Sequence, residues 1–413
     1  MKTARIDTLD ILRGFALLGI LLMNILLFGL PFAASFVPSI AIQDQSDLIV
    51  WAVMDVTVEG AMRAIFSILF GAGVFLFLAN PKNGVKLHIR RMLTLLVIGL
   101  FDLFVLMWVG DILIAYALAG LLLTLCRSWR TSRLVSAGIL ITLVLTAQLV
   151  LAQLFLPAMQ QAAVQAELKI EQGEKLSEEA RRNLEEWNEL SEFIAPTEQE
   201  VEEEIISRTT TTSAAFAWHY AKGIETLVST IPSQMLWDAL LMMLFGAALF
   251  KVGFLQGQFS LPFYEKVFVG AFLLGLAINL FEVAQGIHSN FDLFASNNFL
   301  KPTYHIGRLS VALGWIALVI WAAKRFSFGR FLIPVGRLSL TNYLLQSVFG
   351  LLIFTPFGLG LFADLSRTEL YGLVLLIWIL QIVFSTLWLK RFRMGPVEWL
   401  WRYATYPDKP QLR

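Results

Sequence analysis

Charged residues are scarce in this sequence. Only 15% of its 413 residues are Asp, Glu, Lys or Arg, whereas 57% are hydrophobic. Because a soluble domain carries about a quarter charged residues, this composition argues against an ordinary soluble fold. The basic residues form no continuous stripe, which argues against a nucleic-acid-binding surface. We therefore expect membrane lipid as a partner of the chain, and no nucleic acid.

Cysteine and histidine are also rare. Cys126 is the single cysteine, so no disulfide can form within the chain, and the four histidines lie far apart in sequence. No Cys/His spacing typical of zinc is present, and we expect no metal site. The sequence also lacks a Walker loop, a dinucleotide fingerprint and a G-x-S-x-G elbow. These absences exclude the soluble enzyme classes that depend on such motifs.

Long apolar runs are the most abundant feature. They lie near 12–30, 60–79, 92–108, 111–126, 134–157, 234–250, 266–282, 305–322, 331–353 and 371–389. Each is close to the roughly 20 residues that a helix needs to cross the hydrocarbon core, and none alternates with the period of a membrane barrel. We expect an all-α fold, a polytopic transmembrane helical bundle of about ten spans. The first run is long for a signal peptide and contains Arg13 and Asn24, so it is interpreted as a retained span.

The charges of the connections predict the orientation. Every second connection is basic, and those between are acidic or neutral, which is the positive-inside pattern. The basic ones carry Lys82, Lys86, Arg90 and Arg91, then Arg127, Arg130 and Arg133, then Lys324, Arg325 and Arg330, and finally Lys390, Arg391 and Arg393. Both termini are therefore expected in the cytoplasm.

One long acidic connection, 158–232, divides the chain into an N-terminal membrane half, 1–157, and a C-terminal half, 233–413, each with five predicted spans. Apolar residues recur in it at helical spacing, and the glutamates lie mostly on other faces. The apolar positions are Leu176, Ala180, Leu184, Trp187 and Phe193. We expect an acidic helical extracytoplasmic loop that covers the outer surface; the alternatives are a lid over an outward cavity or the contact of a homodimer.

A short internal similarity links the two halves. Residues 67–73, SILFGAG, resemble residues 242–248, MMLFGAA, and both lie in spans predicted to run from outside to inside. Transporters are often built from repeats. Small residues also recur in membrane helices because they permit close packing, which explains the similarity more simply.

Ionisable groups gather near the predicted outer ends of many spans. They are Glu59, Arg63, Asp111, Asp238, Glu282, His288, His305 and Arg308. Because charge within a membrane is costly, such a set indicates a cavity that opens outward. The alternative for each residue alone is an interfacial side chain that snorkels to water.

His305 and Arg308 lie three residues apart, on one helical face. A histidine beside a carboxylate can act as a general base, because its pKa lies near neutrality. Glu282 or Asp238 is the expected partner. His219 and His288 are weaker candidates, and a histidine at a helix start is often only a hydrogen-bonded surface group.

Other polar residues lie deeper or on the cytoplasmic side. Asp102 stands in the middle of a span and must be paired or protonated. Asn342 and Gln346 share a helical face, which equally suits interhelical hydrogen bonding. Near the cytoplasmic ends of spans, basic groups can meet a phosphate-bearing cofactor or only lipid headgroups. The basic residues are Arg13, Arg337 and Arg402, and the acidic residues Asp10 and Glu398 are predicted at the same level.

Four segments resemble the YeiB family, whose C-terminal part is the DUF418 domain. They are Arg5-Ile6-Asp7-Thr8-Leu9-Asp10-Ile11-Leu12-Arg13-Gly14-Phe15-Ala16-Leu17-Leu18-Gly19-Ile20, Trp108-Val109-Gly110-Asp111-Ile112-Leu113 with Tyr116-Ala117, Gly336-Arg337-Leu338-Ser339-Leu340-Thr341-Asn342-Tyr343-Leu344-Leu345-Gln346-Ser347, and Gly395-Pro396-Val397-Glu398-Trp399-Leu400-Trp401-Arg402. The segments are spread over nearly the whole chain. The resemblance implies a multi-pass protein of the bacterial cytoplasmic (inner) membrane.

The family is in turn similar to heparan-glucosaminide N-acetyltransferases and, more remotely, to acyltransferase-3 membrane proteins. Those pass an acyl group from cytoplasmic acyl-CoA to an acceptor across the membrane, and a histidine on the far side is central. Carried over, Asp10 and Arg13 would be structural or would face CoA. The relatives place their histidine soon after the first span, where residues 30–58 contain none. Either this chain uses another base, such as His305, or it is not an acyltransferase of that type.

The first functional hypothesis is therefore a transmembrane acyltransferase that uses acyl-CoA (acetyl-CoA) and a glycan or lipid acceptor. The expected catalytic residues are His305, Glu282, Asp238, Arg308, Arg63 and Asp111. The expected cofactor-binding residues are Arg13, Arg90, Arg91, Arg337, Asn342, Gln346 and Arg402. The alternative is a transporter or flippase of a small or amphipathic solute, with Asp102 as a proton carrier. A non-catalytic membrane partner of another protein is a third hypothesis.

Overall fold

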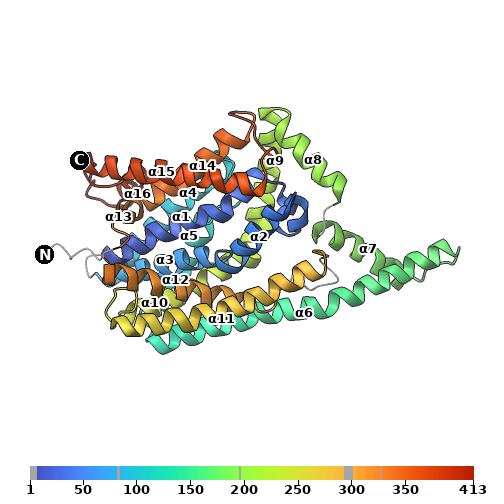
Figure 1. The fold of residues 1–413 in the computed structure, drawn as a ribbon, viewed down its shortest axis with the longest axis horizontal. Coiled ribbons are helices and arrows are strands. Elements are labelled where there is room, and N and C mark those ends of the chain that lie inside the picture. Colours follow the sequence, from blue (N-terminus) through green and yellow to red (C-terminus); the bar gives the residue numbers. More distant parts are fainter. Residues whose placement is uncertain (1–6, 81–83, 195–196, 293–300, 327) are drawn as a thin grey trace.

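The computed structural model describes residues 7–80, 84–194, 197–292, 301–326 and 328–413, and this part of the chain is helical without strands (Figure 1). The longer helices are α1 (Asp7–Gly29), α2 (Gln45–Thr57), α3 (Ala61–Leu78), α4 (Val85–Phe104), α5 (Leu113–Leu123), α6 (Thr131–Glu171), α7 (Glu178–Ile194), α8 (Glu198–Thr209), α9 (Thr212–Glu225), the π-helix η4 (Thr226–Met235), α10 (Leu236–Lys251), α11 (Leu261–His288), α12 (Tyr304–Phe326), α13 (Leu332–Arg337), α14 (Ser339–Phe354), α15 (Arg367–Arg391) and α16 (Pro396–Thr405). The predicted all-α fold is confirmed.

Nine of the ten apolar runs coincide largely with one of these helices, and the run 331–353 is divided between α13 and α14. Seven helical stretches of the described residues are long and apolar enough to cross a membrane. Two more, α5 and α14, are apolar but shorter. The tenth, α4, contains Lys86, Arg90 and Arg91 in its first half, which lowers its mean hydropathy. The chain is thus a membrane-type helical bundle, and the number of spans stays a prediction.

The bundle has two distinct ends. The start of α1 and the C-terminus lie together at one end, which we call the terminal end, with α13 and α16 (Figure 1). The opposite end, which we call the loop end, carries α7 and α8. This arrangement suits an even number of crossings. The cytoplasmic placement of the terminal end stays a prediction, and Lys82, which contributed to it, lies outside the described residues.

The predicted extracytoplasmic connection is helical almost throughout. Helix α6 continues through Pro157 to Glu171 instead of ending at the predicted boundary, since a proline removes one helical hydrogen bond and the residues after it are good helix formers. The predicted amphipathic helix is α7. At the other boundary, α9 and η4 run directly into α10, with Pro232 inside η4.

Helices α3 and α10 pack closely through the segments that share the LFGA sequence. A side chain added at Gly71 of α3 would overlap the backbone of Met243, and one added at Gly246 of α10 would overlap the backbone of Ile68. The shift along the chain that takes Ile68 to Met243 also takes Gly71 to Gly246. An approximate two-fold axis therefore relates the two helices. The small residues allow the close approach, and equivalent residues of the two helices make equivalent contacts.

The same relation extends to the neighbouring helices. Helix α12 packs against α3 as α5 packs against α10, and the pairs α4–α5 and α11–α12 each pack together. Helix α2 contacts α11, and α9 contacts α4. Both central helices follow a break: Gly60, with a φ of 63°, precedes α3, and the π-helix η4 precedes α10. These contacts therefore relate the two halves as an internal repeat, although small-residue packing was the simpler explanation of the sequence similarity.

Candidate functional site

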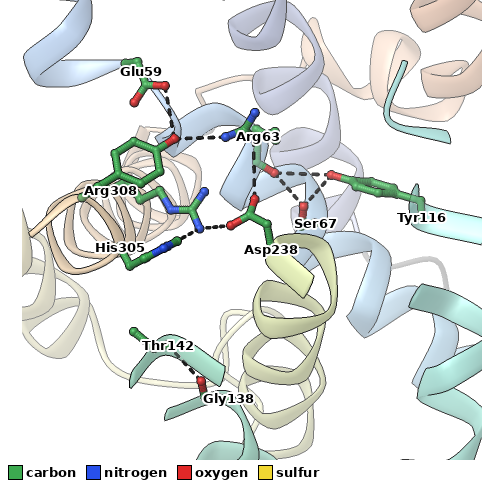
Figure 2. Close-up of polar contacts among 10 residues, drawn as sticks. Glu59, Arg63, Ser67, Tyr116, Gly138, Thr142, Asp238, His305 and Arg308 are labelled. Atoms are coloured by element: carbon green, nitrogen blue, oxygen red, sulfur yellow. Dashed lines mark hydrogen bonds and ion pairs between the residues drawn. The ribbon is translucent and has the colours of Figure 1, made fainter. Parts of the chain in front are cut away.

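A group of buried and partly buried polar side chains lies where α3, α10 and α12 meet (Figure 2). We call it the ion cluster, and it consists of Glu59, Arg63, Asp238, Tyr304, His305 and Arg308. Arg63 and Asp238 stand in the first turns of α3 and α10, and the last three belong to the start of α12. The structure thus brings together four of the six predicted catalytic residues: Arg63, Asp238, His305 and Arg308.

Asp238 lies between two arginines. Its Oδ2 is 3.7 Å from Nε of Arg63, and its Oδ1 accepts a hydrogen bond from Nη2 of Arg308. Arg308 is almost fully buried, whereas Arg63 is partly exposed. Arg63 and Asp238 occupy equivalent positions in the two repeated helices, so this ion pair lies at the centre of the repeat.

Tyr304 links the arginines to Glu59. Its hydroxyl accepts a hydrogen bond from Nη2 of Arg63 at 3.0 Å and donates to Oε1 of Glu59 at 3.2 Å. The guanidinium of Arg308 stands 4.7 Å from the centre of the Tyr304 ring, a cation–π contact. The cluster contains two carboxylates and two guanidinium groups, so their formal charges balance.

His305 contacts Arg308 rather than a carboxylate. Nη2 of Arg308 lies 2.9 Å from Nδ1 of His305. Because a guanidinium only donates, Nδ1 must accept, and the proton of a neutral ring is then on Nε2. His305 can take up a proton at Nδ1 only when Arg308 moves away from it. Asp238 therefore orients His305 through Arg308.

Two of the hydrogen-bond donor atoms of Arg308 are not used within the described part of the chain. Its Nε and Nη1 are buried and have no hydrogen-bond partner in the described part of the chain. Buried donors without acceptors are costly, and they suit an oxygen of a bound molecule. A carbonyl oxygen that becomes negative during a reaction would be stabilised by such donors.

Glu282 lies in a neighbouring polar group. Its Oε1 accepts a hydrogen bond from Oγ1 of Thr303 at 2.5 Å, not from His305. Beside it, Nζ of Lys301 is 2.9 Å from Oδ2 of Asp55. Burial lowers the pKa of Lys301, but the Asp55 carboxylate outweighs it, so that the pKa is raised and the ion pair persists.

Tyr116 and Ser67 support the backbone of α3 next to the ion cluster. Their hydroxyls are 2.5 Å apart, and Oγ of Ser67 donates to the carbonyl of Arg63 at 3.0 Å. Tyr116 on α5 contacts α3, and Arg308 on α12 contacts Asp238 on α10, so the two side chains have similar places in the two halves. This contact fixes the position of Arg63.

Asp111 is not part of the ion cluster. It is fully buried between α4 and α5 and interacts with Asp102. Nε1 of Trp108 donates to the hydroxyl of Tyr343 on α14 at 3.0 Å, as does the backbone N–H of Ile112 at 3.2 Å. Two of the segments that resemble the YeiB family therefore meet at Tyr343.

The predicted cofactor-binding arginines lie at the terminal end. Arg13 of α1 lies against Gly73 of α3. Arg13 and Arg402 are both near enough to Arg91 for their charges to act on it, and Arg91 stacks on Trp401 at 4.3 Å. These arginines form a basic group contributed by α1, α4 and α16. It can hold an anion such as a phosphate.

The other predicted cofactor residues have different surroundings. Arg90 is exposed, and Arg337 donates to the carbonyl of Arg393 at 3.1 Å. Asn342 donates to Oγ of Ser385 at 2.8 Å, and Gln346 to the carbonyl of Leu17 at 3.1 Å. These two amides therefore connect α14 to α15 and to α1, which is the interhelical bonding considered as their alternative role.

The four YeiB-like segments converge on α13 and α14. A side chain at Gly336 would overlap the backbone of Asp10, so the first and third segments touch. Glu398 of the fourth segment accepts from the backbone N–H of Leu340 at 2.7 Å and from Oγ1 of Thr341 at 2.5 Å. Glu398 therefore caps α14. Burial raises the pKa of this carboxyl, while Thr341 lowers it.

Sequence reasoning missed a buried ion pair in the acidic connection. Nη1 of Arg208 donates to Oε1 of Glu204 at 2.8 Å, and Glu204 also accepts from the backbone N–H of Phe32. Burial lowers the pKa of Arg208 to about 10, against the effect of Glu204. The two residues are four apart in a helix, which was the available signal. Tyr304 was missed because a tyrosine at a helix start has no such signal.

Comparisons with known proteins cover the whole chain. The profile of DUF418, described as a protein of unknown function, matches residues 249–408. The chain is 33% identical over 409 residues to the Uncharacterized protein YeiB of Escherichia coli (strain K12), which covers 96% of this chain and 95% of that protein. It is 27% identical over 426 residues to the Uncharacterized protein YxaH of Bacillus subtilis (strain 168), covering 98% and 95%. No solved structure matches the chain significantly.

Proposed function

This chain belongs to the YeiB family, and we propose that it is a membrane-embedded acyltransferase that moves an acyl group from cytoplasmic acyl-CoA to an acceptor on the other side of the membrane. One observation carries the proposal. Charged groups gather at two places along α3: the ion cluster at Arg63 and the basic group at Gly73, where Arg13 lies. Ten helical residues span about 15 Å, a distance comparable to the extended pantetheine arm of CoA.

The basic group is suited to bind acyl-CoA, the acyl donor. The phosphates of CoA would bind Arg13, Arg91 and Arg402, because guanidinium groups bind phosphate oxygens through paired hydrogen bonds. The thioester would then extend along α3 towards Arg63. Arg90, Arg337, Asn342 and Gln346 lie outside this basic group, and the last three bond to Arg393, Ser385 and Leu17. Arg13 also has a protein partner, Asp10, at 3.1 Å, which a phosphate would share or displace.

The ion cluster suits the transfer step. The hydroxyl or amine of the acceptor gives its proton to His305, and its oxygen or nitrogen bonds to the thioester carbon. The C–S bond then breaks, and CoA leaves as a thiolate that takes up a proton. Arg308 would leave Nδ1 of His305 and stabilise the oxyanion, so one movement both frees the base and supplies the donor.

Donor binding is tested by calorimetry of acetyl-CoA with the purified protein in detergent, with a nucleoside triphosphate as control. We expect selective binding of about micromolar strength, roughly −8 kcal/mol. Arg13→Gln with Arg402→Gln should weaken it about tenfold, whereas the exposed Arg127→Gln should not. His305→Ala should bind the donor normally and transfer no acyl group. Equal binding of acetyl-CoA and the triphosphate would refute the donor site, and full activity of His305→Ala would refute its role.

A transporter is the second candidate, because the internal repeat favours it. Parallel repeats with interrupted helices at matching positions are a frequent construction of transporters, with the binding site at the repeat interface. Here the Arg63–Asp238 pair occupies that interface. Solute accumulation in proteoliposomes that requires a gradient and no CoA would support transport over acyl transfer.

A further inference from the structure

Two buried carboxyl groups outside the ion cluster have no ionic partner. Asp102, near the end of α4, and Asp111, just before α5, are 0% and 1% exposed. In the described part of the chain, neither forms an ion pair with Lys, Arg or His. The nearest titratable groups are the two carboxyls themselves and the hydroxyl of Tyr343 on α14. Two carboxylates placed together in a medium of low dielectric repel each other, and both lose hydration.

The hydrogen bonds around the pair are incomplete. Four buried oxygens have no partner among the described residues: both carboxyl oxygens of Asp102, Oδ1 of Asp111 and Oγ of Ser347. Ser347 is 1% exposed and comes from a third helix, α14, next to Asp102. The hydroxyl of Ser347 is therefore placed to donate to one oxygen of Asp102, which leaves the other oxygen of Asp102 and Oδ1 of Asp111 without a donor.

Asp111 is the better placed of the two to remain charged. Its Oδ2 accepts a hydrogen bond from the backbone N–H of Ile114 at 2.9 Å, in the first turn of α5, where the helix dipole favours a negative charge. The hydroxyl of Tyr343, which already accepts from Trp108 and Ile112, faces Asp111 with its own proton. Asp102 has no comparable donor apart from Ser347.

We propose that Asp102 and Asp111 form a proton-binding site, a carboxylic acid and a carboxylate that share one proton. The proton resides on Asp102 and is donated to Oδ1 of Asp111, while Ser347 donates to the other oxygen of Asp102. The shared proton supplies a partner for Oδ1 of Asp111 and for one oxygen of Asp102, and the hydroxyl hydrogen of Ser347 joins the other two orphaned atoms. The shared proton also removes one of the two buried charges. This inference does not depend on the proposed acyl transfer.

A small cavity adjoins the segment between Asp102 and Asp111. This cavity of about 10 Å³, room for roughly one water, lies beside Leu106 and Met107, which directly precede Trp108. The cavity also borders Gly350, one turn beyond Ser347 on α14, and Arg208 and His219 from the acidic connection. Water in this cavity would lie close to this segment, although Asp102 and Asp111 do not line the cavity.

Infrared spectroscopy of the protein in detergent tests the proposal, because a protonated carboxyl has its own C=O stretching band. Carbon-13 labelling of aspartate separates this band from those of glutamate. We expect an aspartic acid band at neutral pH in the wild type that Asp102→Asn removes, alone or together with Asp111→Asn, because the proton resides on Asp102. Asp47→Asn is the matched control: Asp47 is equally buried but accepts from the backbone N–H and the hydroxyl of Thr368, so the band should persist.

Thermal unfolding gives an independent readout. Asp102→Asn should unfold at or above the wild-type temperature at neutral pH, because an amide replaces a neutral acid, whereas Asp47→Asn should unfold lower. A band that is absent from the wild type, or that persists in the double variant, overturns the proposal. So does stabilisation by Na⁺, but not by choline, that both substitutions abolish, because the site would then bind a metal cation rather than a proton.

Discussion

At the scale of single residues, the ion cluster depends on Asp238. This one carboxylate neutralises Arg308, which is 1% exposed, and also contacts Arg63. Removing one partner of a buried ion pair leaves an uncompensated charge, whereas removing both partners often costs little. The sequence indicated the members of the cluster but not this dependence, since Asp238 lies far along the chain from both arginines.

Asp238→Asn should therefore destabilise the protein strongly, by about 3–5 kcal/mol. Thermal unfolding in detergent measures the effect, with the exposed Glu186→Gln of α7 as the control that should change nothing. Asp238→Glu keeps the charge and should recover part of the loss. An unfolding temperature of Asp238→Asn equal to that of the wild type would mean that the arginines are neutralised by other groups.

At the scale of helices, the repeat is held by glycine contacts between α3 and α10. Both Gly71 and Gly246 lie against backbone atoms of the opposite helix, which no side chain can displace without moving the helix. Leucine-rich surfaces alone would give no preferred register in lipid, so small residues and the Arg63–Asp238 pair determine how the two helices fit.

Gly71→Ala and Gly246→Ala should destabilise the protein by similar amounts, about 1–3 kcal/mol each, because each adds a methyl group where no space exists. Gly270→Ala and Gly372→Ala are matched controls on α11 and α15, where an added methyl group meets nothing. They should leave stability unchanged or slightly raised. If one central glycine tolerates alanine and the other does not, the two-fold relation between α3 and α10 is incorrect.

At the scale of the whole molecule, the orientation in the membrane can be tested because the chain has one cysteine. Cys126 is buried, and Cys126→Ser provides a background without thiols. In it, Glu186→Cys on α7 should react with a membrane-impermeant maleimide in intact cells, since α7 is predicted to be extracytoplasmic. Asp408→Cys near the C-terminus should react only after lysis. The opposite labelling would invert the predicted topology and the direction of acyl transfer.

Local chemistry in the sequence was enough to predict the kind of fold. Apolar runs of the length of a membrane span form helices wherever they occur, because lipid offers no partner to an unpaired backbone. The amphipathic pattern of α7 and the LFGA similarity are likewise properties of neighbouring residues. The same reasoning placed Arg63, Asp238, His305 and Arg308 at one level of the bundle.

Only the tertiary structure decided which of these groups meet. His305 contacts Arg308 and not Glu282, Asp111 lies beside Asp102, and Asn342 bonds to Ser385. Each contact depends on the rotation and register of helices that are packed against one another, often far apart in sequence. Rotation and register arise from the fit of many side chains at once, such as Gly71 against Met243, and no local pattern contains them.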